Sequence, residues 1–409
     1  MQKRNSSMEF GPILSAMLRN KTGPALIAIQ IALTLAVVVN AVFIIGERIE
    51  KISRPSGMDV DNIIAVSSSG LGEDFNLRES VREDLEALEA IPGVVAATTT
   101  QHVPLSGSGW GTGLKPAPGP EAPTVSGVQY LVSSRAVDTL GVEIAAGRDF
   151  TPDDVMYPET FGVPPESIMI TRAMADELFP DSQALGAIVY DNLDNPITII
   201  GIVERMHGAW VGWEKLANVM LVPRVPLGDS ASIWYLVRTE PGERNRVMPL
   251  VEQTLAKVND RRMVEELEAM ADIRARSYAS DSAMAVLLAV VIGLMVVVTA
   301  VGIVGLASFA VRQRTKQIGT RRAIGARRID IIRYFMVENW VVTTFGVTAG
   351  TVLAFALNYW LVTSYSLEPL NPLYVPAGIV CLWALGLAAV YGPARRAAAI
   401  SPAVATRTV

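Results

Sequence analysis

The stretch from Val311 to Tyr334 constrains the fold of this chain more than any other. It carries eight arginine and lysine residues against one acid, Asp330, and it separates two apolar segments, Ala283 to Ala310 and Phe335 to Val362. An arginine at the centre of a bilayer costs roughly 2.5–3.5 kcal/mol, so this stretch cannot lie in the hydrocarbon. It therefore predicts a loop between two membrane spans, and positively charged loops stay in the cytoplasm.

Two further apolar runs, Pro24 to Ile45 and Tyr374 to Val390, complete a set of four. The first is 22 residues long, about 33 Å as a helix, which is enough to cross a bilayer. Its apolar run is longer than that of a signal peptide, and no small-residue cleavage site follows it, so we expect an uncleaved span. The sequence predicts transmembrane helices at 23–46, 282–311, 335–363 and 374–392.

The charges that flank the four spans all agree with a single membrane topology. The tail at 393–409 contains arginines and no acid, whereas the loop at 364–373 contains one acid and no base. Both termini are therefore expected in the cytoplasm, with 312–334 as a cytoplasmic loop and 47–281 outside. Residues 1–22 place Phe10, Ile13, Leu14, Met17 and Leu18 at helical spacing, which predicts an amphipathic helix on the cytoplasmic face.

The composition fits a chain that is part membrane helix and part water-exposed domain. Half of the residues are hydrophobic, 18% are charged, and the mean hydropathy is +0.34. The net charge of −5 gives no reason to expect a nucleic-acid partner. One cysteine, Cys381, and two histidines, His102 and His207, rule out an internal disulfide and disfavour a metal centre. We expect no cofactor.

The sequence also lacks the motifs of common catalytic sites. Its one Lys-Ser/Thr pair, Lys21-Thr22, follows Asn20 rather than a glycine-rich turn, so no phosphate-binding loop is present. We therefore expect a non-catalytic subunit. Glu338, near the inner end of the third span, could be a functional intramembrane carboxylate. We favour an interfacial residue that pairs with Arg333 or a neighbouring helix.

The outside segment 47–281 begins and ends with the same pattern. Residues 62–67 and 94–100 read as strands around a helix whose apolar face contains Leu77, Val81, Leu85 and Leu88. Residues 232–238 read as a strand, followed by a helix over 247–258. Residues 263–270 read as a closing strand, although their acidic composition also permits a helix. Two such β-α-β units can share one antiparallel sheet with the helices on one face.

Between these units we predict an insert of mixed α/β structure, at about 101–229. It opens with a glycine- and proline-rich passage, SGSGWGTGLKPAPGPEAP, which we expect to be loop. Trp110 in that loop is either an exposed contact or packed on its own domain. The rest of the insert reads as strand, short helix, strand, strand.

The cationic loop has more structure than a charge anchor needs. Gly319 and Gly325 bracket a helix-competent piece, TRRAI, and helical spacing resumes afterwards with Ile329, Ile332 and Phe335 on one side. A lipid-surface anchor, worth about 1 kcal/mol per cation, is the simpler alternative. A short basic helix that docks on a soluble partner is the other.

The loop sequence RQRTKQIGTRRAIGARRIDI closely resembles that of the MacB/FtsX-type ABC transporter permeases. In that family the loop forms a coupling helix that sits in a groove of the cytoplasmic ATPase. The resemblance implies ATPase-coupling roles for the following residues: Arg314, Thr315, Lys316, Gln317, Ile318, Gly319, Arg321, Arg322, Ala323, Gly325 and Ala326. It also implies that ATP hydrolysis belongs to a separate chain, since no fused ATPase precedes the first span.

The outside segment resembles the periplasmic core domain of the same family. The matching landmarks are Gly147 to Phe150, Ala175 to Pro180, Gly186 and Ile200 to Val203. The resemblance implies an inner-membrane, multi-pass permease that acts as a homo- or heterodimer and drives export of a periplasmic substrate. A periplasmic adaptor and an outer-membrane duct are further implied partners. Lipoprotein release, signalling to cell-wall hydrolases and a purely structural anchor are the alternatives.

Overall fold

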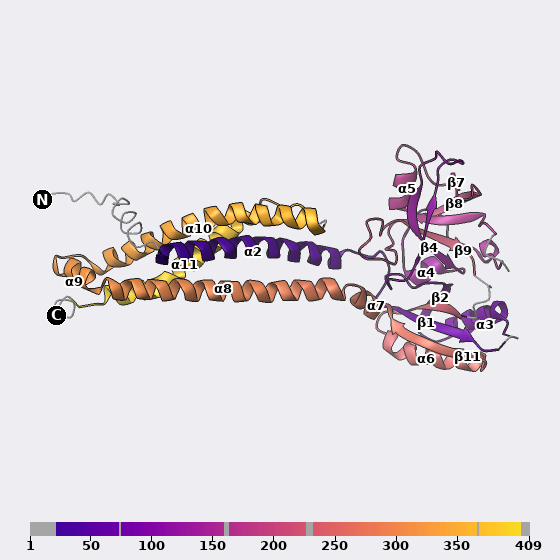
Figure 1. Ribbon diagram of the computed structural model, residues 1–409. Helices are drawn as coiled ribbons and strands as arrows, with labels where there is room; N and C mark the ends of the chain where they lie inside the picture. The colour runs from indigo at the N-terminus through magenta and orange to yellow at the C-terminus, as the bar shows by residue number, and fades with distance from the viewer. Residues whose placement is uncertain (1–21, 73–74, 159–162, 226–231, 366–367, 402–409) are drawn as a thin grey trace. The chain divides into compact units, whose positions relative to one another are not determined.

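The computed structural model describes residues 22–72, 75–158, 163–225, 232–365 and 368–401 (Figure 1). The predicted N-terminal amphipathic helix and the residues after Ser401 lie outside these ranges. The chain divides into two units, one formed by residues 1–53 with 281–409 and the other by residues 54–280. We call them the helical unit and the α/β unit and describe each by itself.

Four long helices make up most of the helical unit. They are α2 (Thr22–Ser53), α8 (Ala279–Gln313), α10 (Arg328–Tyr365) and α11 (Tyr374–Ala398), and each is long and apolar enough to cross a membrane. All four predicted spans fall within them. The helices extend beyond the predicted spans, because polar residues at a helix end continue the backbone hydrogen bonds outside the hydrocarbon. Helix α11 continues past Pro393, so residues 393–398 of the predicted tail are helical.

Helices α2 and α10 pack closely through small residues. A Cβ added to Gly346 would lie 2.9 Å from the carbonyl oxygen of Ala28, and one added to Gly350 would lie 2.9 Å from that of Ala32. Glycine therefore lets the two backbones approach, as in other membrane helix pairs. The Asn40 side chain of α2 donates to the carbonyl of Ala354 on α10, at 3.0 Å.

Helix α8 is much less buried within the unit. It buries Asp281, Thr299, Ile303 and Val311. Thr299 contacts α2 through a 2.8 Å hydrogen bond between its hydroxyl and that of Thr34. Most of the other α8 side chains, such as Val286 and Val301 at 65% exposure each, are open to the surroundings. They suit lipid or another membrane helix.

The α/β unit contains an antiparallel set of four strands in the order β11-β1-β10-β2. The first β-α-β segment comprises β1 (Ile63–Gly70), α3 (Leu77–Glu89) and β2 (Val94–Thr100), and the last comprises β10 (Ser232–Thr239), α6 (Arg244–Val258) and β11 (Arg262–Ala269). The strand alternative for 263–270 is therefore the one observed. A short helix, α7 (Met270–Ser277), follows it.

The same sheet continues into the insert in the order β2-β4-β9-β6-β8-β5, with β3 beside β4 and β7 beside β8. The only residue pair that joins β2 to β4 among the described residues is Thr100–Val132. The elements of the insert are β3 (Trp110–Leu114), β4 (Val125–Val132), α4 (Ala136–Leu140), β5 (Ile144–Gly147), the 3-10 turn η1 (Pro152–Asp154), β6 (Ser167–Thr171), α5 (Arg172–Leu178), β7 (Ile188–Tyr190), β8 (Pro196–Val203) and β9 (Val219–Pro223).

One expectation for the insert was wrong. Residues 110–114 form strand β3 rather than loop, because they pair with β4 from Trp110–Gln129 to Leu114–Val125. Glycine weakens a strand locally, but the partner strand supplies the backbone hydrogen bonds. The Trp110 side chain is 52% exposed.

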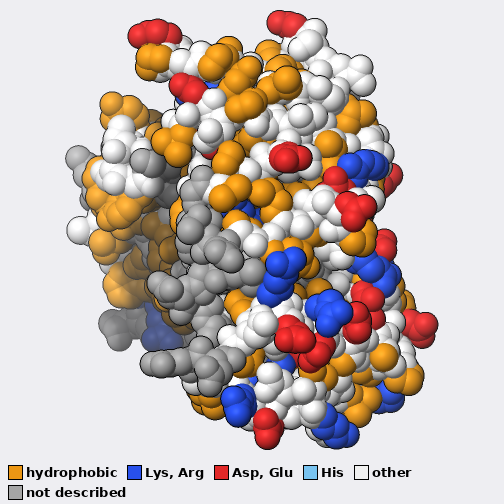
Figure 2. Space-filling model, turned by 90° about the vertical axis from the view of Figure 1, so that its right-hand side faces the viewer, with side chains coloured by type: hydrophobic (Ala, Val, Ile, Leu, Met, Phe, Trp, Pro, Cys, Tyr) orange, Lys and Arg blue, Asp and Glu red, His pale blue; other side chains and the backbone are white. Residues whose placement is uncertain are grey.

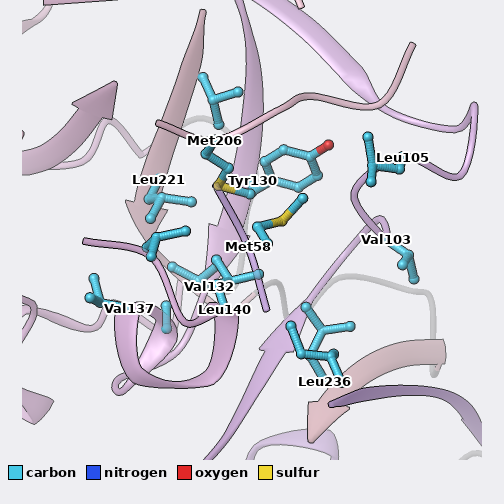
Figure 3. Close-up of a cluster of buried hydrophobic side chains, with 14 of the residues drawn as sticks. Met58, Val103, Leu105, Tyr130, Val132, Val137, Leu140, Met206, Leu221 and Leu236 are labelled. Carbon is cyan, nitrogen blue, oxygen red and sulfur yellow. The ribbon is translucent and has the colours of Figure 1, made fainter. Parts of the chain in front are cut away.

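Buried side chains of the α/β unit form separate apolar clusters. One joins the insert to strands β1 and β10 and includes Met58, Tyr130, Met206, Leu221 and Leu236 (Figure 3). Another lies under α3 and α6 and includes Val81, Leu88, Val247, Val251 and Leu255. On the face that Figure 2 shows, acidic and basic side chains are interspersed with hydrophobic ones.

Candidate coupling segment

Residues 312–334 contain a short helix, α9 (Thr315–Ala323), between α8 and α10 (Figure 1). The helix ends in a specific backbone motif at Gly325, which has a φ of +103°. The Gly325 amide donates to the carbonyl of Arg322 at 3.2 Å, and the Ala326 amide donates to that of Arg321 at 3.0 Å. This is the Schellman arrangement, in which a glycine in the left-handed region satisfies the last carbonyls of a helix.

The next helix starts at once. The Asp330 carboxylate accepts a hydrogen bond from the backbone N–H of Arg327, at 2.9 Å. This is one half of a capping box, in which an acidic residue in the first turn satisfies the amide of the residue before the helix. The segment therefore has a defined stop at Gly325 and a defined start at Arg328, so it forms two helices joined by a tight turn.

The inward face of α9 is apolar. Ile318 and Gly319 are buried, and Ile318 shares a cluster with Ile331 and Phe335 of α10. Gly319 lies inside α9, so the expectation that it brackets the helix was wrong and only Gly325 ends it. Ile329 is 62% exposed, so the expectation that it shares a side with Ile332 and Phe335 was also wrong. Ile331 occupies that position instead.

An ion pair connects the start of α9 to the body of α10. The Arg314 guanidinium lies 2.8 Å from the Glu338 carboxylate, with side-chain exposures of 21% and 13%. The same guanidinium donates to the Tyr334 hydroxyl at 3.3 Å. Arg321 lies over the Tyr334 ring, 5.1 Å from its centroid, which is a cation–π distance. Of the two expected partners for Glu338, Arg333 or a neighbouring helix, the second is observed, because α9 folds back onto α10 and brings Arg314 at its start to Glu338.

The outward face of the segment is cationic with an apolar tip. Lys316, Gln317, Arg321 and Ala323 of α9 are exposed, and Ile324 in the turn is 80% exposed. The predicted coupling residues therefore separate into three sets by burial. Ile318 and Gly319 are buried, Arg314, Thr315, Arg322 and Ala326 are half-buried, and the following are exposed: Lys316, Gln317, Arg321, Ala323 and Gly325.

Sequence reasoning missed Tyr334 as a member of this site. Its ring lies between Arg314 and Arg321, which are 20 and 13 residues earlier in the chain. No spacing rule within one helix links these positions, since the contact depends on the turn at Gly325. Within the ranges that the structure describes, no group of three or more His, Cys, Asp or Glu side chains could hold a metal ion.

Comparison with known proteins identifies the family. Residues 25–272 match the family model of the MacB-like periplasmic core domain, and residues 289–402 match that of the FtsX-like permease C-terminal domain. The chain is 26% identical over 285 residues to the macrolide export ATP-binding/permease protein MacB of Neisseria gonorrhoeae. That match covers 67% of this chain and 42% of the relative.

Two other proteins are similar over comparable lengths. The ABC transporter permease YknZ of Bacillus subtilis is 25% identical over 276 residues, covering 65% of this chain and 66% of that protein. The crystal structure of the periplasmic region of MacB from Actinobacillus actinomycetemcomitans covers 56% of this chain and 97% of that one, with 14% identity and a TM-score of 0.32. The assignment rests on the family models, of which the first alone covers more than half of the sequence. The chain therefore belongs to the MacB/FtsX-type family of ABC transporter permeases.

Proposed function

We propose that this chain is the permease subunit of a MacB-like transporter that passes the energy of ATP hydrolysis from a cytoplasmic ABC ATPase to its periplasmic domain. The motion of that domain would drive export of a periplasmic substrate. The observation that carries the proposal is the geometry of α9. The helix is fixed on its inward face by Ile318 and the Arg314–Glu338 pair, and it presents cations around the exposed Ile324.

This surface has the features of a protein-docking element. An apolar tip ringed by charges resembles the anchor and polar rim of an ordinary interface. A charge anchor on lipid needs only the cations, whereas here a Schellman turn also fixes the shape of the tip. The exposed set Lys316, Gln317, Arg321, Ala323 and Ile324 would contact the ATPase, and the buried set would position them.

The remaining assignments follow the same scheme. We propose that α2, α8, α10 and α11 cross the inner membrane with both termini in the cytoplasm. Residues 47–281 would form the periplasmic domain, with two β-α-β units as one subdomain and the insert at about 101–229 as another. A second permease copy or a paralogue would complete the transporter. A periplasmic adaptor and an outer-membrane duct would extend it.

The docking proposal is tested by purifying the tagged chain from its native membranes and identifying the ATPase that accompanies it. Lys316→Glu should weaken that association about tenfold, because it places an acid where the partner meets cations. Arg395→Glu is the matched control, since Arg395 is an exposed cation at the end of α11. Equal association of the Lys316→Glu variant and wild type would contradict the proposed interface, as would equal losses in the two variants.

The topology is tested by cysteine labelling in a Cys381→Ser background. Ser106, Gln317 and Glu368 are all exposed, so a cysteine at each can react. A membrane-impermeant reagent added to spheroplasts should label Ser106→Cys and Glu368→Cys but should label Gln317→Cys only after permeabilisation. Labelling of Gln317→Cys in intact spheroplasts would reverse the orientation.

A further inference from the structure

We propose that motion of α9 reaches α2 through α10 rather than along α8, and that the Arg314–Glu338 ion pair makes α9 move together with α10. The inference rests on the proposed function, because it specifies how docking at α9 is transmitted. It makes Glu338 a positioning residue that has no contact with the ATPase.

The link between α9 and α10 is formed by three kinds of contact. The Arg314–Glu338 pair, with both side chains less than a quarter exposed, is partly shielded from water. Such a pair is screened less than one on the surface. The Arg321–Tyr334 contact and the burial of Ile318 against Ile331 and Phe335 add to it. These contacts hold α9 against the first three turns of α10.

Helix α8 is a weaker route although it directly precedes α9 in the chain. The helical backbone is interrupted at Arg314, which has a φ of −100° and a ψ of 12°. Most of α8 also lacks packed neighbours within the helical unit, as the 61% and 62% exposures of Leu287 and Leu294 show. Helix α8 touches α2 at separate points, namely the Thr34–Thr299 hydrogen bond and the ion pairs of Asp281 with Arg48 and Lys51. It lacks the continuous close packing that joins α10 to α2, so it constrains α2 less.

The contacts from α10 to α2 are close. Gly346 and Gly350 bring the α10 backbone against Ala28, Ile31 and Ala32 of α2, and Asn40 bonds to Ala354. A displacement of α10 must therefore carry α2, because interdigitated backbones cannot slide without clashes. Helix α2 ends at Ser53, and Arg54 begins the α/β unit. The route from α9 to the edge of that unit thus consists of packed contacts.

The first test uses the full chain in detergent, without a partner, and measures amide hydrogen exchange. Glu338→Gln should speed exchange in residues 315–323 about fivefold, because one of the contacts that hold α9 is lost. The double variant Arg314→Glu with Glu338→Arg should return exchange toward wild type. Arg333→Gln is the control, because Arg333 is an exposed cation on the same helix. Unchanged exchange in Glu338→Gln, or equal acceleration in the control, would overturn the link.

The second test uses the complex with the co-purified ATPase. In wild type, ATP should change hydrogen exchange at residues 44–53 of α2. Glu338→Gln should keep ATPase association and hydrolysis while this change shrinks about fivefold, and the charge-swapped double variant should restore it. An ATP-dependent change confined to residues 281–290 of α8 would overturn the route. Absence of any associated ATPase in wild type would instead overturn the proposed function, while the exchange test on the isolated chain still decides the link.

Discussion

Asp84→Ala is expected to lower the free energy of unfolding of the α/β unit by about 3–5 kcal/mol. The Asp84 and Arg262 side chains are 0% and 1% exposed, and their carboxylate and guanidinium lie 2.6 Å apart. The same carboxylate oxygen accepts from the Tyr235 hydroxyl at 2.5 Å and from the Ser80 hydroxyl at 3.2 Å. Burial, followed by the nearby Asp84 charge, raises the pKa of Tyr235, so this hydroxyl stays a neutral donor. Removing Asp84 leaves the Arg262 charge buried without its counter-ion, which is the main cost.

The cluster joins three elements, since Asp84 and Ser80 lie on α3, Tyr235 on β10 and Arg262 on β11. Thermal unfolding of the full chain in detergent should show a fall in Tm on the order of 10 °C for the α/β unit. Hydrogen exchange in β1 and β10 should report the same loss. Asp138→Ala is the matched control, because Asp138 pairs with Arg135 on the surface with side-chain exposures of 59% and 43% and should cost under about 1 kcal/mol.

A double variant tests the stated cause. Asp84→Leu with Arg262→Met removes both charges, and it should recover most of the stability lost in Asp84→Ala because no unpaired charge remains. If Asp84→Ala is as stable as Asp138→Ala, the pair does not hold the α/β unit together. If the double variant is no better than Asp84→Ala, the hydrogen bonds rather than the unpaired charge account for the loss.

The membrane helices could be predicted from the sequence because their evidence is local. A run of about 20 apolar residues has few other stable places in a protein, and each predicted span falls within an observed helix. The β-α-β segments were also found, because α3 and α6 show a clear apolar face. Strands β3, β4 and β9 were not predicted, because their pairing is not local in the sequence. Val128 of β4 pairs with Val219 of β9, and no pattern within either strand predicts that partner.

The helical form of residues 312–334 was predicted in outline, but its contacts were not. Gly325 was expected to bound the short helix, and it ends that helix with a positive φ. The turn at Gly325 then folds α9 back onto α10, and this brings Arg314 to Glu338 across 24 residues of sequence. The sequence left Arg333, which lies near Glu338 in the chain, and a neighbouring helix as the expected partners. Only the three-dimensional turn separates these two possibilities.

Gly325→Val is expected to weaken ATPase association at least about tenfold without loss of membrane insertion. A φ of +103° is open to glycine but strained for a β-branched residue, at a cost of roughly 1–3 kcal/mol. No atom lies within 4 Å of the position where a Cβ would be placed, so the cost comes from the backbone and not from a clash. The backbone can relieve it by leaving the Schellman turn, which displaces Ile324 and the cations on either side.

Two matched variants separate this effect from general destabilisation. Gly242→Val introduces the same side chain at a φ of +86° with no atom within 4 Å, but in the α/β unit ahead of α6. It should keep ATPase association near wild type. Gly325→Asn should retain more association than Gly325→Val, because asparagine tolerates a positive φ better than valine. Membrane levels of each variant are measured first, and association with the co-purified ATPase second.

The comparison decides between the two interpretations of the cationic segment. Gly325→Val removes no charge, so an anchor on anionic lipid should hold as well as in wild type. A docking helix depends on the position of its exposed tip, so it should fail when the turn opens. Full association and transport in Gly325→Val would therefore show that the shape of residues 315–326 is not needed. Failure of Gly325→Val with normal Gly242→Val would show that the turn after α9 sets the surface that the ATPase recognises.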